Sequence, residues 1–88
     1  MNWKIEVKPS AEIQYRKLDK KTRQRIMSAF RDLEGSPNPL FSKDVKALTG
    51  SLKGDYRLRV GNWRILFAPV RSVSRIYVYA ILPRGNSY

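Results

Sequence analysis

The chain has 88 residues, and its 18 Lys and Arg residues outnumber its 7 Asp and Glu residues, which makes the formal net charge +11 at pH 7. It contains no histidine and no cysteine, so disulfides, cysteine chemistry and the usual zinc ligand sets are excluded, and no metal or cofactor is expected. The length fits one domain over residues 1–88, the charge predicts a polyanionic partner, and the lack of a membrane-spanning apolar run or a secretory signal predicts a soluble, cytoplasmic protein.

The N-terminal half predicts one strand and two helices. Residues Trp3 to Val7 alternate apolar and charged side chains, as in a half-buried strand. A short amphipathic helix is predicted from Ala11 to Leu18. Asp19 can cap a second helix that runs to about Glu34. The two helices are expected to form a hairpin.

The C-terminal half predicts three strands. Residues 40–54 show no clear periodicity and are interpreted as an irregular connector. Two alternating segments, Asp55 to Val60 and Trp63 to Phe67, flank Gly61-Asn62, which is a two-residue hairpin signal. A last strand is predicted from Arg75 to Leu82. The expected fold is α+β, in the order β-α-α-β-β-β, with a small and mostly antiparallel sheet packed on the helical hairpin and its other face open.

Three arginines are predicted on the open face of the β-hairpin. Arg57 and Arg59 alternate with the apolar residues of the first hairpin strand, and Arg64 does so on the second. Arginine can hold a phosphate bidentately and stabilise the negative charge that grows on a phosphoryl group. The simpler alternative is a solvated face whose cations prevent the sheet from pairing edge to edge.

The residue types near this cluster restrict its chemistry. Only Asp44 and Asp55 are acids nearby, and no imidazole is present to activate a nucleophile, so hydrolysis of neutral bonds is disfavoured. RNA brings its own nucleophile, the 2′-OH, which a protein need only orient in line with the next phosphate. Cleavage would then leave a 2′,3′-cyclic phosphate and a 5′-OH. Guanidinium groups, with pKa values above about 12, and phenols, with values of about 10, are poor general bases, so positioning is expected to carry most of the rate effect.

Four segments resemble, in order and spacing, the RelE/ParE superfamily of bacterial and archaeal toxins, and in particular its RelE branch of mRNA interferases. They are Lys46 to Gly50, Tyr56 to Gly61, Trp63 to Phe67 and Arg84 to Tyr88. The resemblance covers nearly the whole chain. It implies the toxin of a type II toxin-antitoxin system, which enters the ribosomal A site, cleaves mRNA there without a metal, inhibits translation, and is neutralised by a cognate acidic antitoxin.

The resemblance also implies roles for five residues. Basic residues that act in proton transfer and phosphate binding in the RelE branch match Arg57 and Arg59. The arginine of the next strand matches Arg64, and the one after the last strand matches Arg84. The C-terminal tyrosine matches Tyr88, which would stack on a base and assist a proton transfer. Lysine often occupies the first two positions, and arginine there is a poorer base.

Further residues are candidates for RNA contacts. They are Lys43, Lys46, Lys53, Tyr77 and Tyr79, of which the two tyrosines are expected to face outward and stack on unpaired bases. A basic run at the start of the second helix is interpreted mainly as a solvated face, with contact to ribosomal RNA phosphates as the alternative; it consists of Lys20, Lys21, Arg23 and Arg25. Strict alternation along the last strand places Arg84 on the core face with Ala80 and Leu82, unless Pro83 redirects the chain.

Two other functions fit the same fold. One is a ParE-like toxin that inhibits DNA gyrase by binding and has no nuclease activity. The other is a non-catalytic nucleic-acid-binding module, whose expression without a partner would be harmless. The arginine cluster with Tyr88 favours cleavage over both.

Overall fold

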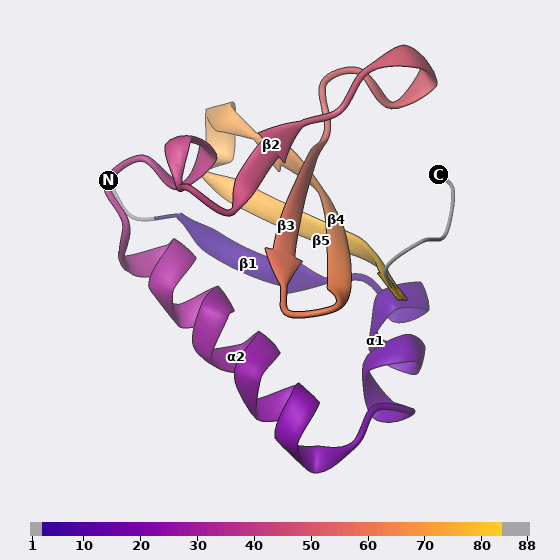
Figure 1. The fold of residues 1–88 in the computed structure, drawn as a ribbon. Helices are drawn as coiled ribbons and strands as arrows, with labels where there is room; N and C mark the ends of the chain where they lie inside the picture. Colours follow the sequence, from indigo (N-terminus) through magenta and orange to yellow (C-terminus); the bar gives the residue numbers. More distant parts are fainter. Residues whose placement is uncertain (1–2, 84–88) are drawn as a thin grey trace.

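The computed structural model describes residues 3–83, and within them two helices lie on one face of a five-stranded sheet (Figure 1). In chain order the elements are β1 (Lys4–Val7), α1 (Pro9–Arg16), α2 (Lys20–Gly35), β2 (Val45–Ala47), β3 (Tyr56–Val60), β4 (Trp63–Val70) and β5 (Arg75–Pro83). The strand order across the sheet is β1-β5-β4-β3-β2, with β1 parallel to β5 and the other neighbours antiparallel. The predicted α+β class is confirmed, with one strand more than the predicted order contained.

Local sequence signals account for the starts of both helices. α1 begins at Pro9, two residues earlier than predicted, because the first helical position does not need the N–H that proline lacks. The Asp19 carboxylate accepts a 3.2 Å hydrogen bond from the backbone N–H of Thr22, which confirms Asp19 as the cap of α2. The buried positions of α2 follow helical spacing and are Ile26, Phe30 and Leu33.

The core lies between the helices and the sheet face that they cover. Leu58, Ile65 and Ile81 are neighbours in register across three strands, and each is buried. They belong to the same apolar cluster as Ile26 and Phe30 of α2. Burying this face of the β3–β4 hairpin turns the alternate side chains toward the opposite face.

The segment from Leu40 to Gly54, which the sequence indicated to be an irregular connector, contains the edge strand β2. Val45 pairs with Leu58 and is buried in the core. Short 3₁₀ turns at Pro39–Phe41 and Gly50–Leu52 flank the strand. The interpretation was wrong for β2 because three residues are too few to show an alternation, and pairing with β3 is what holds them extended.

A β-bulge interrupts the pairing of β4 with β5. Phe67 pairs with Val78, but the preceding residue Leu66 pairs with Ala80, so Tyr79 is an extra residue on β5. A bulge of this kind reverses the faces of the residues that follow it.

The reversal changes the end of β5. Ile81 is buried in the core, whereas Ala80 and Leu82 are only partly buried, and Leu82 lies opposite Arg64 in register. The prediction that Ala80 and Leu82 lie on the core face was therefore wrong. The same alternation was the reason for expecting Arg84 on the core face, and Arg84 itself lies outside the described residues.

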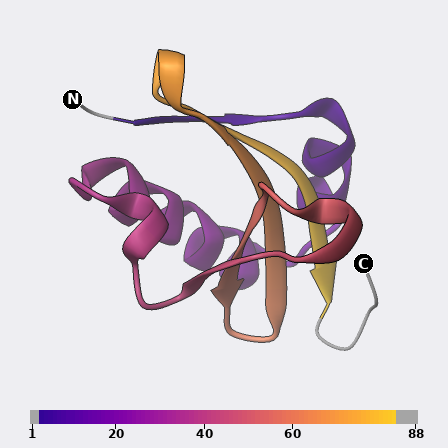
Figure 2. The same cartoon turned by 90° about the horizontal axis from the view of Figure 1, so that it is seen from above.

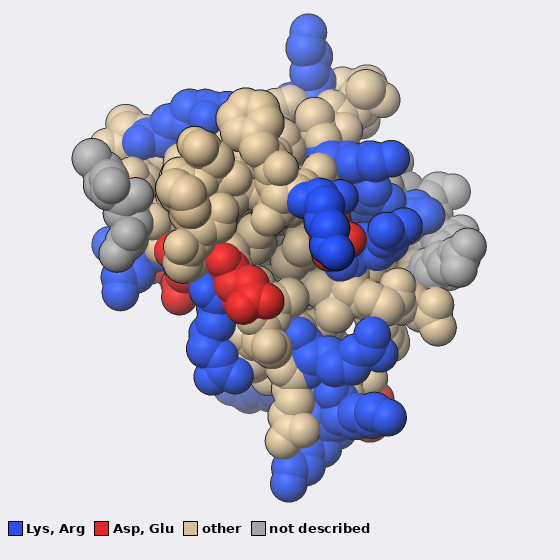
Figure 3. Space-filling view, turned by 60° about the vertical axis from the view of Figure 1, so that its left-hand side comes forward, with Lys and Arg blue, Asp and Glu red and all other residues tan. Residues whose placement is uncertain are grey.

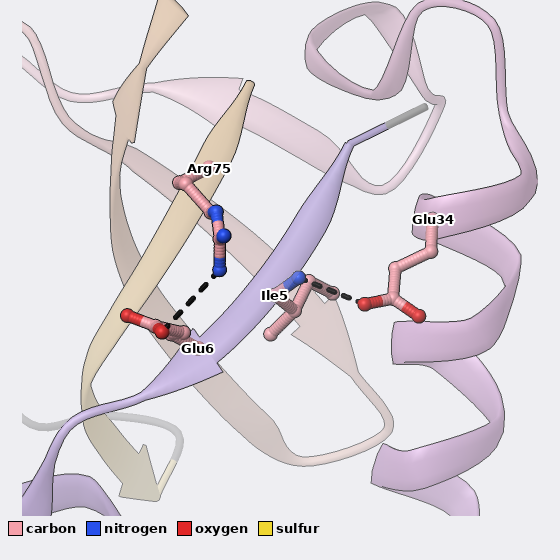
Figure 4. A network of polar contacts seen from close by, with 4 residues as sticks. All are labelled: Ile5, Glu6, Glu34 and Arg75. Atoms are coloured by element: carbon pink, nitrogen blue, oxygen red, sulfur yellow. Dashed lines mark hydrogen bonds and ion pairs between the residues drawn. The ribbon is translucent and has the colours of Figure 1, made fainter. Parts of the chain in front are cut away.

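The outer edge of β1 is held by a side chain from α2. The backbone N–H of Ile5 donates a 2.8 Å hydrogen bond to the Glu34 carboxylate, and beside it Glu6 lies 3.4 Å from the guanidinium of Arg75 on β5 (Figure 4). Capping an edge N–H in this way leaves less of the strand available for pairing with another chain.

Seen from above, β1 runs across the direction of the β3–β4 hairpin, as the twist of the sheet requires (Figure 2). It pairs with only the first part of β5, up to Val78. Beyond that point α1 satisfies the edge of β5: Ser10 Oγ donates to the Tyr79 carbonyl at 2.9 Å, and the Ile81 N–H donates to Gln14 Oε1 at 2.7 Å.

Candidate functional site

The turn that closes the β3–β4 hairpin brings arginines of both strands together. Gly61 has a φ of 57°, which suits the first central position of a type II′ turn. Val60 pairs with Trp63 across this turn, and one step further Arg59 lies directly opposite Arg64. Like charges directly opposite each other repel, so this pair concentrates positive charge beside the hairpin turn.

A hollow of about 220 Å³, which we call the hairpin hollow, opens at this end of the sheet. It is lined by Arg57, Arg59, Gly61, Asn62, Trp63 and Arg64. The structure thus brings together the three arginines that the sequence placed on one face. Among residues 3–83, those that line the hollow include three arginines and no carboxylate, a set of charges that suits a phosphate group.

Asp44 is the acid next to this cluster. Its backbone carbonyl accepts a 2.9 Å hydrogen bond from the N–H of Arg59, and its carboxylate lies 3.6 Å from the Arg59 guanidinium. Both side chains are largely exposed, and such ion pairs contribute about 0 to 1 kcal/mol. Asp44 therefore biases where the Arg59 side chain lies without holding it firmly.

Next to the hairpin hollow, basic and apolar side chains lie side by side across three strands on the same face of the sheet. Lys46 of β2 lies opposite Arg57, which lies opposite Leu66 of β4. Leu66 is 2% exposed although it does not belong to the main core cluster. The arginine face thus contains a covered apolar position beside its cations, and Lys46 places a further positive charge there.

The other two predicted lysines lie in different places. Lys43 immediately precedes Asp44 and lines a second hollow that includes Arg59. Lys53 lines a separate hollow formed by residues 47–56 around the turn before β3. The structure therefore brings Lys43 and Lys46, but not Lys53, next to the arginine cluster.

The two predicted stacking tyrosines have partners of their own. The ammonium of Lys8 lies 4.8 Å from the ring centre of Tyr77. The hydroxyl of Tyr79 donates a 2.7 Å hydrogen bond to the Asp55 carboxylate. Burial raises the pKa of Tyr79 above its ordinary value, and the hydrogen bond to Asp55 raises it to a smaller extent. This phenol therefore stays protonated and is no general base at neutral pH. Neither tyrosine lines the hairpin hollow.

Two predicted site residues, Arg84 and Tyr88, lie outside the described residues. Among residues 3–83 there is no group of three or more acidic side chains that could hold a metal ion. No helix in this part of the chain is long and apolar enough to cross a membrane.

Arg25 of α2 is a neighbour of the cluster that the sequence analysis did not single out. A Cβ atom placed on Gly61 would lie 2.9 Å from a guanidinium nitrogen of Arg25, so this side chain lies against the hairpin turn. The two residues are far apart in sequence, and Arg25 appeared there as one member of a basic run. Only the packing of α2 beside the hairpin places it at the site.

Comparison with solved structures shows which known proteins share this fold. The toxin-antitoxin complex RelBE2 from Mycobacterium tuberculosis matches with a TM-score of 0.83 and 19% identity, covering 96% of this chain and all of that one. The archaeal RelE-RelB complex from Pyrococcus horikoshii OT3 matches with a TM-score of 0.79 and 24% identity, covering 99% of this chain and all of that one. A YoeB/ParE toxin from Agrobacterium tumefaciens matches with a TM-score of 0.75 and 17% identity over 92% of this chain and 98% of that one.

These similarities establish the RelE/ParE fold for the chain. No protein-family model matches the sequence, and no curated protein matches it significantly.

Proposed function

We propose that the protein is the toxin of a type II toxin-antitoxin system and acts as a ribosome-dependent endoribonuclease on mRNA in the A site. The observation that carries this proposal is the direct pairing of Arg59 with Arg64, beside Arg57, in a hollow that these three arginines line. The fold shared with RelE proteins that are found in complexes with RelB supports it.

In this proposal the arginines act on the scissile phosphate. The 2′-oxygen attacks the adjacent phosphorus while the bond from phosphorus to the 5′-oxygen breaks, which leaves a 2′,3′-cyclic phosphate and a 5′-OH. The proton of the 2′-OH is lost and the 5′-oxygen gains one. Arg57, Arg59 and Arg64 bind the phosphate oxygens and stabilise the charge that grows on them. Arg84 would add a further cation, and Tyr88 would stack on a base.

The proposal assigns most of the rate enhancement to positioning. Within the described part of the chain, the residues that line the hairpin hollow include neither a carboxylate nor an amine, and guanidinium groups with pKa values above about 12 rarely accept a proton. Orienting a 2′-OH in line with the phosphate can by itself supply several kcal/mol of the barrier. A ribosome that holds the mRNA bent in the A site would provide this orientation.

The proposal predicts that Arg64→Ala abolishes most of the cleavage. Primer extension on a defined mRNA in a reconstituted translation reaction should show ribosome-dependent cuts with the wild-type protein. Loss of one preorganised charge-stabilising group should reduce the cleavage rate by about 10²-fold. Arg84→Ala is expected to act in the same direction.

Arg71→Ala is the matched control. Arg71 is an exposed arginine that follows β4 at the end away from the hairpin turn, so its loss changes the net charge equally and should leave the cuts unchanged. If the wild-type protein makes no cuts with or without ribosomes, the nuclease proposal is wrong. A DNA supercoiling assay would then test the alternative, a gyrase inhibitor without nuclease activity, which the shared fold with a YoeB/ParE toxin keeps open.

A further inference from the structure

A second hollow lies on the other side of the hairpin turn, between α2 and β3. Its volume is about 370 Å³, and it shares two of its lining residues, Arg59 and Gly61, with the hairpin hollow. We call it the helix hollow. Figure 3 shows one face of the molecule, on which Lys and Arg side chains cover much of the right and the bottom of the view and Asp and Glu side chains form a smaller patch left of its centre. The two hollows therefore adjoin at Arg59 and Gly61, on either side of the hairpin turn.

Arg25 stands at the junction of the two hollows. Its guanidinium lies against Gly61, where a Cβ atom would come within 2.9 Å of it. Arg25 is exposed, and among residues 3–83 its side chain forms no hydrogen bond or ion pair. The absence of a side chain at position 61 therefore leaves space in which this guanidinium meets the hairpin turn and still presents free N–H groups.

The charges of the helix hollow favour an anion. Arg25, Lys43 and Arg59 line it together with two acids, Asp32 and Asp44. The Asp44 carboxylate is already engaged by Arg59, whereas Lys43, like Arg25, forms no ion pair within the described residues. The lining thus carries three cations against two acids, and it adjoins the cluster of three arginines at Arg59.

We propose that the helix hollow binds a phosphodiester of the same single-stranded RNA whose scissile phosphate occupies the hairpin hollow, with Arg25 as its principal ligand. The identity of the ligand rests on the proposed function. Single strands are held by grooves of positive charge that follow the backbone. The planar fork of arginine matches two phosphate oxygens at once. Arg59, which lines both hollows, then lies between two successive backbone contacts.

The test measures the binding of 2′-O-methyl RNA, which cannot be cleaved by 2′-OH attack, by fluorescence anisotropy at several salt concentrations. A single-stranded ligand gives a slope of log affinity against log salt of about −0.7 for each neutralised phosphate. For a long oligonucleotide, Arg25→Ala should weaken binding and reduce the size of this slope by about 0.7. A tetranucleotide that fills only the hairpin hollow should bind both proteins equally.

Two further variants sharpen the result. Arg31→Ala removes an equal charge from an exposed position on the same helix, at a residue that lines neither hollow, and should leave the slope unchanged. Asp32→Asn removes a carboxylate from the helix hollow and should tighten binding of the long oligonucleotide. Circular dichroism on each variant checks that α2 is intact.

The proposal is overturned if Arg25→Ala and Arg31→Ala bind the long oligonucleotide alike. It is also overturned if Arg25→Ala weakens binding to ribosomes that lack mRNA while leaving oligonucleotide binding unchanged, because Arg25 would then contact ribosomal RNA. If the wild-type protein shows this salt dependence and this effect of Arg25→Ala but cuts no mRNA, the nuclease proposal is wrong and the proposed binding site still stands.

Discussion

Among single residues, Arg59 and Tyr79 show how local partners set the chemistry that a side chain can perform. Arg59 faces Arg64 across the hairpin and is only weakly compensated by Asp44, so its charge remains available to a ligand. The Tyr79 hydroxyl donates a hydrogen bond to the Asp55 carboxylate, and the side chain is partly buried. Its phenol therefore acts as a structural donor that ties β5 to the start of β3.

The raised pKa of Tyr79 predicts that, when the tyrosines are titrated with base, one of them ionises in a separate step at higher pH than the others, which we call the late step. Because the folded-state pKa lies above the unfolded value of about 10, the stabilisation by the protonated phenol is complete below pH 10 and is lost as the pH rises through the folded-state value. One of the five tyrosines should thus remain protonated where free tyrosine ionises. Ultraviolet absorbance at increasing pH measures this.

Tyr79→Phe should remove the late step and lower the free energy of unfolding at neutral pH by about 1 kcal/mol, the usual effect of one lost hydrogen bond. Tyr77→Phe on the same strand is the control and should leave the late step in place. Loss of the late step in Tyr77→Phe instead would contradict the assignment to Tyr79.

Among the elements, α2 depends most clearly on a local signal. The Asp19 carboxylate accepts hydrogen bonds from the side-chain hydroxyl and the backbone N–H of Thr22. These bonds, the one from the hydroxyl most strongly, lower the pKa of Asp19 from its ordinary value of 3.8. A lowered pKa means that the stabilisation is complete above the unfolded pKa and is lost as the pH falls through the folded-state value.

Asp19→Ala should therefore lower the melting temperature at neutral pH, and the difference from wild type should shrink as the pH falls below 3.8. Thermal unfolding followed by circular dichroism at neutral and acid pH measures both effects. Asp32→Asn, which removes an acid near the other end of α2, should not lower the melting temperature. A constant deficit of Asp19→Ala at all pH values would argue against capping by the carboxylate.

The strands differ in how far local sequence determines them. β3 and β4 follow from alternation and a two-residue turn, because each signal lies within a few residues. β2 and the bulge at Tyr79 do not follow from local sequence, because each is defined by how one strand pairs with its neighbour. Val45 is extended through its pairing with Leu58, and Tyr79 is an extra residue only relative to Leu66 and Phe67.

For the whole molecule, the net charge of +11 predicts an acidic partner. We expect the protein to form a stable complex when it is co-expressed with the open reading frame next to its own, which under the proposed function encodes an acidic antitoxin. Co-purification on a tag carried by the partner, followed by size-exclusion chromatography, measures this. The antitoxin should cover part of the cationic surface, so the complex should bind RNA more weakly than the free protein does.

A scrambled-sequence version of the partner with the same charge is the control, since it separates specific binding from general attraction between opposite charges. If no complex forms with the neighbouring product, the partner assignment is wrong. A complex that binds RNA as tightly as the free protein would show that the partner covers a different surface.

The sequence by itself determined the class of fold, the cap of α2, the hairpin and the grouping of Arg57, Arg59 and Arg64. These features depend on periodicity and turn chemistry, which act over a few neighbouring residues. Only the tertiary structure decided that Arg25 lies against Gly61, that the helix hollow adjoins the hairpin hollow at Arg59 and Gly61, and that Leu82 shares the face of Arg64. Each of these depends on how elements distant in sequence pack against one another, and no local pattern encodes that contact.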